Sequence, residues 1–440
     1  MNSLVETIRD SYFRIGCPKS ILVAYSAGAD SLALLLGLMT VKNELPIEIV
    51  CAHVNHGLRA SACADEKLAI DITRRLDIAL MVKRVEVSRE GNLEAAAREA
   101  RYTALKQAMR ESGAQVIALA HHADDQAETM MMNLARGSGL DGLAGMNEFR
   151  PPYWRPLLSI PKSVLIDALK GAGMRWAEDE SNQDTVFLRN DLRLNVLPKL
   201  ERRAPGVAVR MSRTAGLLQD EKDMLENEAA SWLSCYAKAE RPFFFLMTGP
   251  LNKLHLAMQR RVLRALCFQA GVMLDYEQTQ RVLSFLSSMP GSILALPKNN
   301  LVFLSSQRLH ILSDNAKLID VVWQQPQRAL PGEGLGDGMH EQVVDARLIN
   351  DALMRSVRPG DNIRPLGASG RQTMQKYLSA RKIDKPFRAY WPVYAVESKV
   401  LWVPGCGVSH EAAIHSDEQP RTKLVFAQAL PHEIITDGDK

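Results

Sequence analysis

A short run of small residues between an apolar strand-like segment and an apolar helix-like segment constrains this chain most. The run is Ser26–Ser31, with the sequence SAGADS; it follows the strand formers of Ile21–Tyr25 and precedes the helix-type residues of Leu32–Met39. A turn between a strand and a helix gathers backbone N–H groups and the positive end of the helix dipole at one point. Such a point suits an anion, most often a phosphate. An ordinary tight turn is an equally good explanation of the small residues alone.

The polar side chains of this run also suit a phosphate. Ser26 and Ser31 supply hydroxyl donors, and Asp30 supplies a carboxylate for a metal that bridges phosphates. No lysine follows the glycine in the pattern of a Walker loop, which excludes that type of phosphate site.

The segments after the loop alternate between strand and helix patterns. We expect strands over 47–53, 80–87 and 116–120, and helices over 63–76 and 93–113. This βαβαβαβ order predicts an α/β fold with a doubly wound parallel sheet, whose ligand lies at the carboxyl ends of the strands.

The remaining sequence predicts two further domains. We place the nucleotide domain at 1–205, a mostly helical middle domain at 206–325 and a small α+β domain at 340–430. Within the middle domain, 207–288 is expected to be almost wholly helical and 290–312 to form short strands. The stretch 324–338, rich in Gln, Pro and Gly, is a candidate linker.

The composition sets broad limits on function. The 440 residues carry a net charge of +4, which neither requires nor excludes a nucleic acid partner, although basic residues cluster at Arg189–Arg193 and Lys199–Arg203. The six cysteines form no CxxC pair, so neither a zinc site nor a disulfide framework is indicated. Without a signal-like start or an apolar run near twenty residues, we expect a cytoplasmic protein with no membrane contact. No obligate protein partner is evident.

Two polar strings follow expected elements of the nucleotide domain. His53 and Val54 close the second strand, where their backbone can read an adenine edge, although solvated loop histidines are the commoner outcome. Arg98 and Arg101 share one helix face, an arrangement suited to phosphates or a carboxylate. A solvated charged face explains this arginine pair as well.

The densest cluster of charge follows the fourth expected strand. His121 precedes three acids, Asp124, Asp125 and Glu128, within about one turn of a helix start. The carboxylates repel one another unless a cation, a metal or an ammonium group compensates them. The alternative is a first helical turn that the helix dipole stabilises.

The loop resembles the SGGxDS loop of the N-type ATP pyrophosphatases, which cleave ATP to AMP and pyrophosphate. Ser26, Gly28, Asp30 and Ser31 match, whereas Ala27 stands where that family has its first glycine. The alanine is tolerated if its φ angle is negative, because a side chain disfavours positive φ.

Taken in order along the chain, the motifs resemble the tRNA(Ile)-lysidine synthase family. The resemblance covers most of the chain and is weakest in the helical middle. The matching strings include HVNHGLR at 53–59, HHADDQAET at 121–129, RNDLR at 189–193 and LWVPG at 401–405.

The resemblance implies a ligase that forms a carbon–nitrogen bond in two steps. ATP adenylates C2 of the wobble cytidine of tRNA(Ile) with a CAU anticodon, and L-lysine then displaces AMP to give lysidine. ATP and Mg²⁺ are the implied cofactor and metal. The implied ATP-binding residues are Ser26, Ala27, Gly28, Ala29, Asp30, Ser31, His53 and Val54, with Asp30 holding the metal. The implied catalytic residues are Asp30, Arg101, His121 and Asp125. Lysine is expected at Asp124, Asp125 and Glu128, and the anticodon loop at Arg189, Asn190 and Arg193.

Two other functions compete with this interpretation. A tRNA thiolase of the same superfamily shares the phosphate loop but normally needs paired cysteines, and the nearest pair, Cys51 and Cys63, is a poor match. A non-catalytic tRNA-binding protein with a degenerate nucleotide fold is the other, and Ala27 is its one support.

Overall fold

The computed structural model describes residues 2–55, 57, 62–85, 93–177, 188–240, 243–312, 324–330, 336–337, 340–383, 387–416 and 418–427. They fall into two compact units, residues 1–224 and 225–440, called here the N-terminal and C-terminal units.

The N-terminal unit is built on one six-stranded sheet with the order β3-β2-β1-β4-β6-β5. All neighbouring strands run parallel except the last pair, β6 and β5. The strands are β1 (Ser20–Ala24), β2 (Glu48–Asn55), β3 (Leu80–Arg84), β4 (Val116–Ala118), β5 (Phe149–Arg150) and β6 (Tyr153–Trp154). The expected doubly wound parallel sheet is therefore confirmed.

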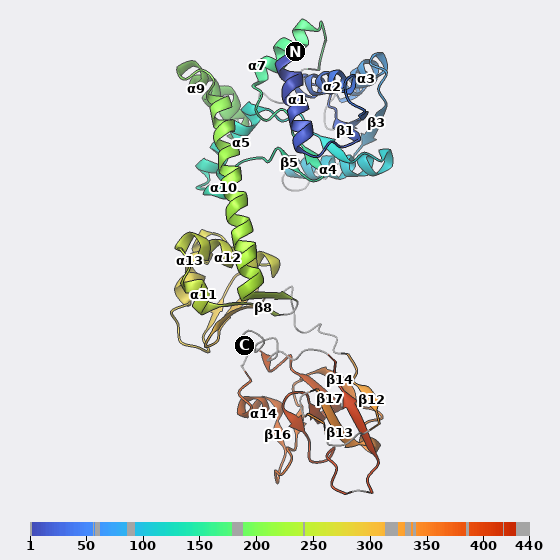
Figure 1. The fold of residues 1–440 in the computed structure, drawn as a ribbon, viewed down its shortest axis with the longest axis vertical. Helices are drawn as coiled ribbons and strands as arrows, with labels where there is room; N and C mark the ends of the chain where they lie inside the picture. The colour runs from blue at the N-terminus through green and yellow to red at the C-terminus, as the bar shows by residue number, and fades with distance from the viewer. Residues whose placement is uncertain are drawn as a thin grey trace. The chain divides into compact units, whose positions relative to one another are not determined.

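Helices cover both faces of this sheet (Figure 1). Residues of α1, α2, α3 and α7 pack on one face, and α4 packs on the other. The helices of the unit are α1 (Asn2–Arg14), α2 (Ala29–Lys42), α3 (Ala62–Arg75), α4 (Leu93–Ser112), α5 (Ala123–Ala135), α6 (Leu140–Leu143), α7 (Lys162–Gly171), α8 (Leu188–Asp191), the π-helical η2 (Leu192–Val196), α9 (Leu197–Arg203) and the start of α10 (Val207–Tyr236).

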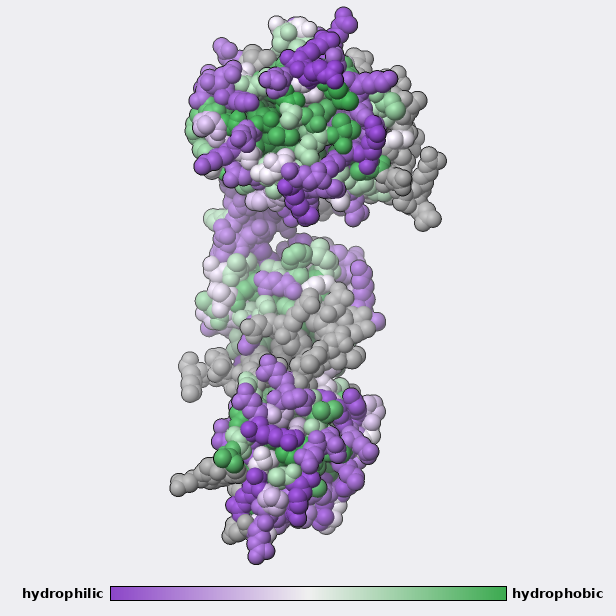
Figure 2. All heavy atoms as spheres, turned by 90° about the vertical axis from the view of Figure 1, so that its right-hand side faces the viewer, coloured by the Kyte–Doolittle hydropathy of each residue, from purple (hydrophilic) through white to green (hydrophobic). Residues whose placement is uncertain are grey.

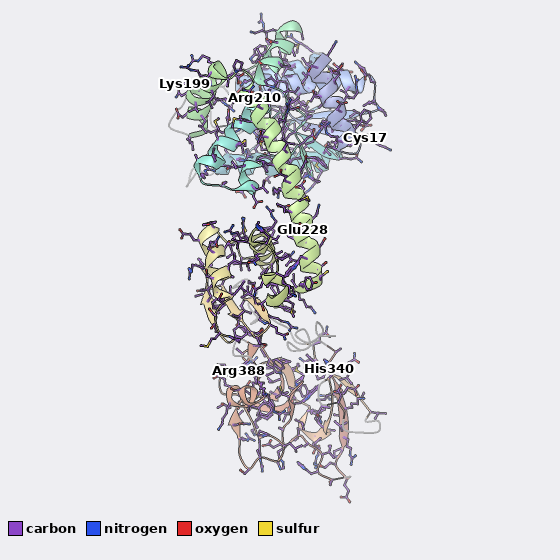
Figure 3. All side chains as sticks on the ribbon, turned by 60° about the vertical axis from the view of Figure 1, so that its left-hand side comes forward. Cys17, Lys199, Arg210, Glu228, His340 and Arg388 are labelled. Atoms are coloured by element: carbon purple, nitrogen blue, oxygen red, sulfur yellow. The ribbon has the colours of Figure 1, made fainter. Side chains whose placement is uncertain are left out.

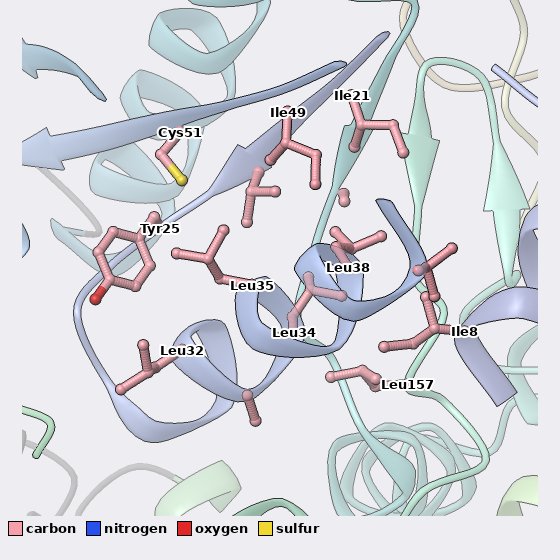
Figure 4. Close-up of a cluster of buried hydrophobic side chains, with 14 of the residues drawn as sticks. Ile8, Ile21, Tyr25, Leu32, Leu34, Leu35, Leu38, Ile49, Cys51 and Leu157 are labelled. Carbon is pink, nitrogen blue, oxygen red and sulfur yellow. The ribbon is translucent and has the colours of Figure 1, made fainter. Parts of the chain in front are cut away.

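Helix α2 is apolar around most of its circumference because other elements surround it. Leu32, Leu35 and Leu38 are fully buried, and the cluster around them includes Ile8 of α1 and Ile21 of β1 (Figure 4). A helix apolar on all sides is stable in water when it is buried on all sides. This packing fixes the start of α2, and with it the loop that precedes the helix.

The C-terminal unit begins with a subdomain that contains the expected helices together with a sheet. Long helices are present as expected, but a five-stranded antiparallel sheet of order β7-β8-β11-β10-β9 accompanies them. Its elements are β7 (Ala237–Glu240), β8 (Phe243–Met247), α11 (Thr248–Asn252), α12 (Leu256–Gln269), α13 (Tyr276–Phe285), β9 (Ile293–Ala295), β10 (Leu301–Leu304) and β11 (Arg308–Leu312).

The expectation that 207–288 is almost wholly helical is wrong at β7 and β8. Three consecutive phenylalanines in β8 favour a strand, since aromatic side chains fit a half-buried pleated surface. The helix-favouring composition of Ala237–Glu240 hides its strand character, which arises from pairing with β8. The short strands expected within 290–312 are confirmed as β9, β10 and β11.

The last part of the chain has the expected α+β character. It contains a three-stranded sheet, β12-β20-β13, and a six-stranded sheet, β14-β17-β18-β15-β16 with β19 beside β18. Helix α14 packs against β15 and β16 of the second sheet. The elements are β12 (Gln327–Ala329), β13 (Glu341–Asp345), the 3₁₀ helix η5 (Ala346–Leu348), β14 (Leu353–Ser356), β15 (Asn362–Ile363), β16 (Gln372–Thr373), α14 (Met374–Ala380), β17 (Pro392–Val396), β18 (Lys399–Val403), β19 (Gly407–Val408) and β20 (Arg421–Val425). The expectation that 324–338 is a linker is wrong at β12, because this strand pairs with β20 of the last domain.

Hydrophilic side chains occur across the displayed face of both units in Figure 2. Among the described residues, every helix is too short or too polar to cross a membrane.

A glycine allows α1 and α2 to pack closely. A Cβ atom at Gly37 would collide with Cδ1 of Ile8, a fully buried side chain. We predict that Gly37→Ala destabilises the N-terminal unit by about 2 kcal/mol, because overpacking forces the buried Ile8 side chain out of its present position. Hydrogen exchange of α1 and α2 amides measures the loss. The control is Gly216→Ala on α10, where a new Cβ meets no heavy atom within 4 Å and helix propensity improves. Equal exchange rates for both variants would contradict the packing argument.

A buried histidine makes the stability of the C-terminal unit depend on pH. Burial, followed by the charge of Arg308, lowers the pKa of His310 to about 3, whereas an unfolded histidine titrates near 6.5. The unfolded chain therefore binds more protons, and stability is lost as the pH falls from about 6.5 towards 3. We predict that wild type loses about 2 kcal/mol more than His310→Phe between pH 7.5 and pH 5. Urea unfolding at both pH values tests this; equal losses would contradict it.

Candidate active site

The candidate site lies at the carboxyl edge of the sheet, between β1 and β4. The strand order runs outward in opposite directions from this pair, which makes it the switch point of the sheet. Ligands of doubly wound sheets bind in the crevice at such a point. The loop at Ser26–Ser31 follows β1, and the string that begins at His121 follows β4. The topology therefore brings together two motifs that are almost one hundred residues apart.

The small-residue loop forms a compact turn into α2. The Ser31 hydroxyl donates to the carbonyl of Gly28 at 3.0 Å and accepts from the N–H of Ser26 at 3.2 Å. Gly28 caps α2 in an extended conformation, without a side-chain cap to its first turn. The loop thus presents the amino end of a fourteen-residue helix, the arrangement that binds phosphate in other folds.

Residue 27 does not keep the negative φ that the sequence analysis required. Ala27 has φ of 64° and is fully buried, so that expectation is wrong. The left-handed conformation costs an L-residue roughly 1–2 kcal/mol. Burial of the methyl group and the hydrogen bond that the Ala27 carbonyl accepts from the N–H of Ala177 at 2.9 Å offset this cost. The alanine therefore takes the backbone shape that a glycine would take, and the loop is retained.

Asp30 stands in the first turn of α2 and faces two cationic groups. Its Oδ2 lies 3.6 Å from Nε2 of His122 and 3.8 Å from Nζ of Lys162. Its Oδ1 is buried and has no hydrogen-bond partner among the described residues. An orphaned carboxylate oxygen beside the amino end of a helix fits Mg²⁺, which takes one or two protein carboxylates and completes its shell with phosphates and water.

His122 is the hub of the site and lies between three carboxylates. Besides Asp30, its ring nitrogens approach Oδ2 of Asp124 at 3.4 Å and Oδ2 of Asp125 at 3.3 Å. Burial disfavours the charged ring, but the carboxylates of Asp124 and Asp30 outweigh burial and raise the pKa of His122 to about 10. The imidazolium links the phosphate-loop carboxylate to the acids of α5.

Two arginines neutralise the remaining acids of α5. Arg193 donates to Glu128 at 2.6 Å and to Asp125 at 2.8 Å, and Arg189 donates to the same two carboxylates at 2.9 and 3.2 Å. Glu128 is fully buried, so its charge needs these partners. Arg193 lies in the π-helical turn η2, an irregularity frequent at functional sites. Arg189 and Arg193, which we expected to contact the anticodon loop, therefore pair with Asp125 and Glu128, which we expected to bind lysine.

Asp125, which lies beside His122, stays ionised although it is buried. Burial would raise the pKa of Asp125, but the charges of His122, His121, Arg189 and Arg193 outweigh burial and lower it. Asp125 also accepts from the N–H of His122 at 3.1 Å, which fixes the start of α5. Asp124 instead accepts from the backbone N–H of Lys162 at 2.9 Å and so ties α5 to α7.

Arg101 and His121 lie close enough to this charged network to feel its charges. Burial, then the charge of Arg98, lowers the pKa of Arg101. Burial, then Arg155 and Arg101, holds the pKa of His121 well below its ordinary value. The Nδ1 of His121 is buried without a partner among the described residues, so a neutral ring offers an unused polar atom beside the charged network.

His53 and Val54 lie where the register of the first two strands ends. The β1–β2 pairing stops at Ala24 and Ala52, whereas β2 continues to Asn55. The Nδ1 of His53 lies 3.0 Å from the carbonyl oxygen of Tyr25, directly before the loop. The backbone of these two residues therefore reaches past β1 at the ligand edge.

Some residues of the site were not predicted. His122 belongs to a motif but has no predicted role. Arg155 begins a further string that matches the family, RPLL at 155–158, and has no predicted role either. Lys162 belongs to no predicted motif. The signal for His122 was its place between a strand end and two acids; Lys162 has none, since its proximity depends on where α7 packs. Parts of the predicted motifs at 56, 58–61 and 178–187 lie outside the described residues.

Comparisons with known proteins show which families the chain is similar to. Residues 5–200 match the family described as PP-loop domain, and residues 353–424 match the TilS substrate C-terminal domain. A tRNA(Ile)-lysidine synthase of Geobacter sulfurreducens is 30% identical over 425 residues, with 90% of each chain covered. One from Chromobacterium violaceum is 32% identical, covering 89% of this chain and 92% of the relative. Among solved structures, the U34-tRNA thiolase NcsA from Methanococcus maripaludis is 18% identical, with a TM-score of 0.43 over 50% of this chain and 79% of its own.

The buried carboxylate of Glu128 provides a test of the charge network. We predict that Glu128→Gln destabilises the α5 region by about 3 kcal/mol, because it leaves Arg189 and Arg193 with too little negative charge. Hydrogen exchange of α5 amides measures this loss. The control is Glu111→Gln, which removes an ion pair with Lys83; the Glu111 side chain is 42% exposed, so water screens this pair and the protection of α5 should stay at the wild-type level. Equal protection of α5 in both variants would show that the arginines do not depend on Glu128.

Proposed function

The chain belongs to the tRNA(Ile)-lysidine synthase family, and on this premise we propose that it uses ATP to join L-lysine to C2 of the wobble cytidine of tRNA(Ile) with a CAU anticodon. The C2 oxygen of the base attacks the α-phosphorus of ATP, and pyrophosphate leaves. The ε-amine of lysine then attacks C2, the bond between C2 and the adenylate oxygen breaks, and AMP leaves. The amine gives up its proton, and lysidine is formed.

One contact set carries this proposal: His122 lies within 3.6 Å of both Asp30 and Asp125. A two-step reaction of this kind needs a phosphate site and an ammonium site that face the same base. Because the carboxylate of each site approaches the same imidazolium, a base adenylated at the first is within reach of an amine held at the second.

The first step depends on charge compensation around the triphosphate. The amino end of α2 and the hydroxyls of Ser26 and Ser31 would hold the departing pyrophosphate. Asp30 would hold Mg²⁺, which neutralises phosphate charge when bound. Arg101 would offset the charge that develops on the phosphates, and His53 with Val54 would meet the adenine.

The second step depends on the acids of α5. Asp125 and Glu128 already bind two guanidinium groups, and an ammonium group is a partner of the same charge. We therefore assign the ε-amine of lysine to this pair, with Asp124 beside it. Asp125 accepts the proton of the amine directly or through His121, whose ring is neutral.

The sequence suggested that the arginines of α8 and η2 contact the anticodon loop, but we infer that they first of all position the carboxylates of α5. Arg189 and Arg193 position the two carboxylates, so contact with the anticodon loop would require them to share their donors. Asn190 lies between them on α8 and stays a proposed anticodon contact. The cytoplasmic location and the absence of an obligate protein partner stay predictions.

The thiolase alternative lacks a suitable sulfur pair. Burial raises the pKa of the Cys51 thiol to about 12, which keeps it protonated and poorly nucleophilic. Cys63, its nearest neighbour in sequence, is exposed. Mass analysis of nucleosides from the tRNA, after incubation with ATP and lysine, tests the function directly; lysidine is the expected product, and an unmodified cytidine would refute the proposal.

Substitutions of Asp30 and Asp125 should affect different steps of the reaction. We predict that Asp30→Ala lowers pyrophosphate release by about 100-fold or more, because the phosphate charge loses its compensation. Asp125→Asn should retain pyrophosphate release and raise the KM for lysine by about tenfold, the effect of losing a charge-assisted hydrogen bond. The control is Asp167→Asn, an exposed carboxylate on α7. Unchanged lysine dependence in Asp125→Asn would rule out the assignment of the ammonium site.

A further inference from the structure

A concentrated patch of positive charge lies where α9 turns into α10. Residues 199–213 contain five basic residues and one acid, so this stretch alone carries a charge equal to that of the whole chain. The five are exposed, and we call them the basic corner: Lys199, Arg202, Arg203, Arg210 and Arg213. Figure 3 labels Lys199 on α9 and Arg210 on α10.

Helical spacing gathers these charges on two faces. Lys199 lies three and four residues before Arg202 and Arg203, and Arg210 lies three residues before Arg213, spacings that place side chains on one side of a helix. The guanidinium of Arg210 donates to the carbonyls of Pro205 and Ala204 at 2.8 and 3.0 Å. These carbonyls directly follow Arg203, so the charge of α10 is brought to the end of α9.

Little negative charge offsets the corner. Its one acid, Glu201, is engaged with the backbone N–H groups of Gly206 and Val207 at the start of α10. In the described part of the chain, no ion pair neutralises Lys199, Arg202 or Arg213. A solvated surface of ordinary composition mixes both signs of charge, whereas the exposed charged side chains of residues 199–213 are all positive.

The corner is fixed to the helix that carries the acids of the candidate site. Leu197 of α9 and Ala208 of α10 pack against Ala127 of α5, the residue before Glu128. The hydroxyl of Ser212 donates to the carbonyl of Leu158 at 2.5 Å, which ties α10 to the segment before α7. A polyanion bound at the corner would therefore lie beside the site.

We propose that the basic corner binds the phosphate backbone of the RNA substrate and so holds it next to the acids of α5. The identity of that RNA rests on the proposed function, whereas the charge complementarity does not. The contacts carry no sequence information, since they are made to phosphates; they set the position of the RNA and add a salt-dependent part of its affinity.

The test is the salt dependence of binding of a tRNA(Ile) transcript to the full chain. The variant Lys199→Gln/Arg202→Gln/Arg213→Gln should bind about 100-fold more weakly near 0.15 M salt, with a slope of log affinity against log salt shallower by about 2–3. A tRNA with another anticodon should lose affinity by the same factor, because phosphate contacts are independent of sequence.

The matched control removes the same charge at the opposite edge of the sheet. Lys42, Arg74 and Arg110 occupy or adjoin the last turns of α2, α3 and α4, which run back from the carboxyl edge. The variant Lys42→Gln/Arg74→Gln/Arg110→Gln should leave the slope unchanged. Equal slopes for the two triple variants would overturn the proposal, since a general charge effect would then explain any loss.

Two further results separate the alternatives. If vesicles of anionic phospholipid bind wild type but not the corner variant, while tRNA affinity is equal in both, the corner is a membrane contact and the RNA assignment is wrong. If no lysidine forms but the corner variant still loses RNA affinity, the proposed reaction fails and the corner stands.

Discussion

Compensation of buried negative charge is the constraint on which the candidate site depends. Four carboxylates from α2 and α5 converge at one edge of the sheet, and such a group is unstable without cations within a few ångströms. His122 supplies one from the same string as the acids. Arg189 and Arg193 supply two more from a segment that follows much later in the chain. The site is therefore complete only when α8 and η2 are folded against α5.

The same constraint joins stability to chemistry. A carboxylate that must bind an ammonium group has to stay ionised while buried, and the cations that keep it ionised compete for the same oxygens. Arg193 binds Glu128 and Asp125 at once, so a substrate amine meets carboxylates whose charge is already shared. An exposed pair would bind an amine with less competition but would be screened by water and salt.

The sequence indicated the N-terminal fold well because its patterns are strong. Apolar runs followed by small or polar residues mark the strand ends, and the order of elements leaves few topologies. The sequence was a poorer guide where the local composition favours one kind of secondary structure and pairing with a distant segment imposes another. Residues 237–240 are Ala, Lys, Ala and Glu, which favour helix, yet they pair with β8. Ala27 is a second case, since its backbone is held at positive φ by burial and by Ala177, a residue far along the chain.

By itself the sequence determined the kind of sheet, the loop at its switch point and the acids that face it, because each is written in neighbouring residues. It also determined the family, through motifs that keep one order along the chain. The tertiary structure alone decided which charges compensate one another. Arg189 and Arg193, which the sequence suggested as contacts to RNA, instead neutralise Asp125 and Glu128. Lys162 lies near Asp30 because of where α7 packs. Which charges pair depends on their distance in space, and that distance cannot be read from their separation along the sequence.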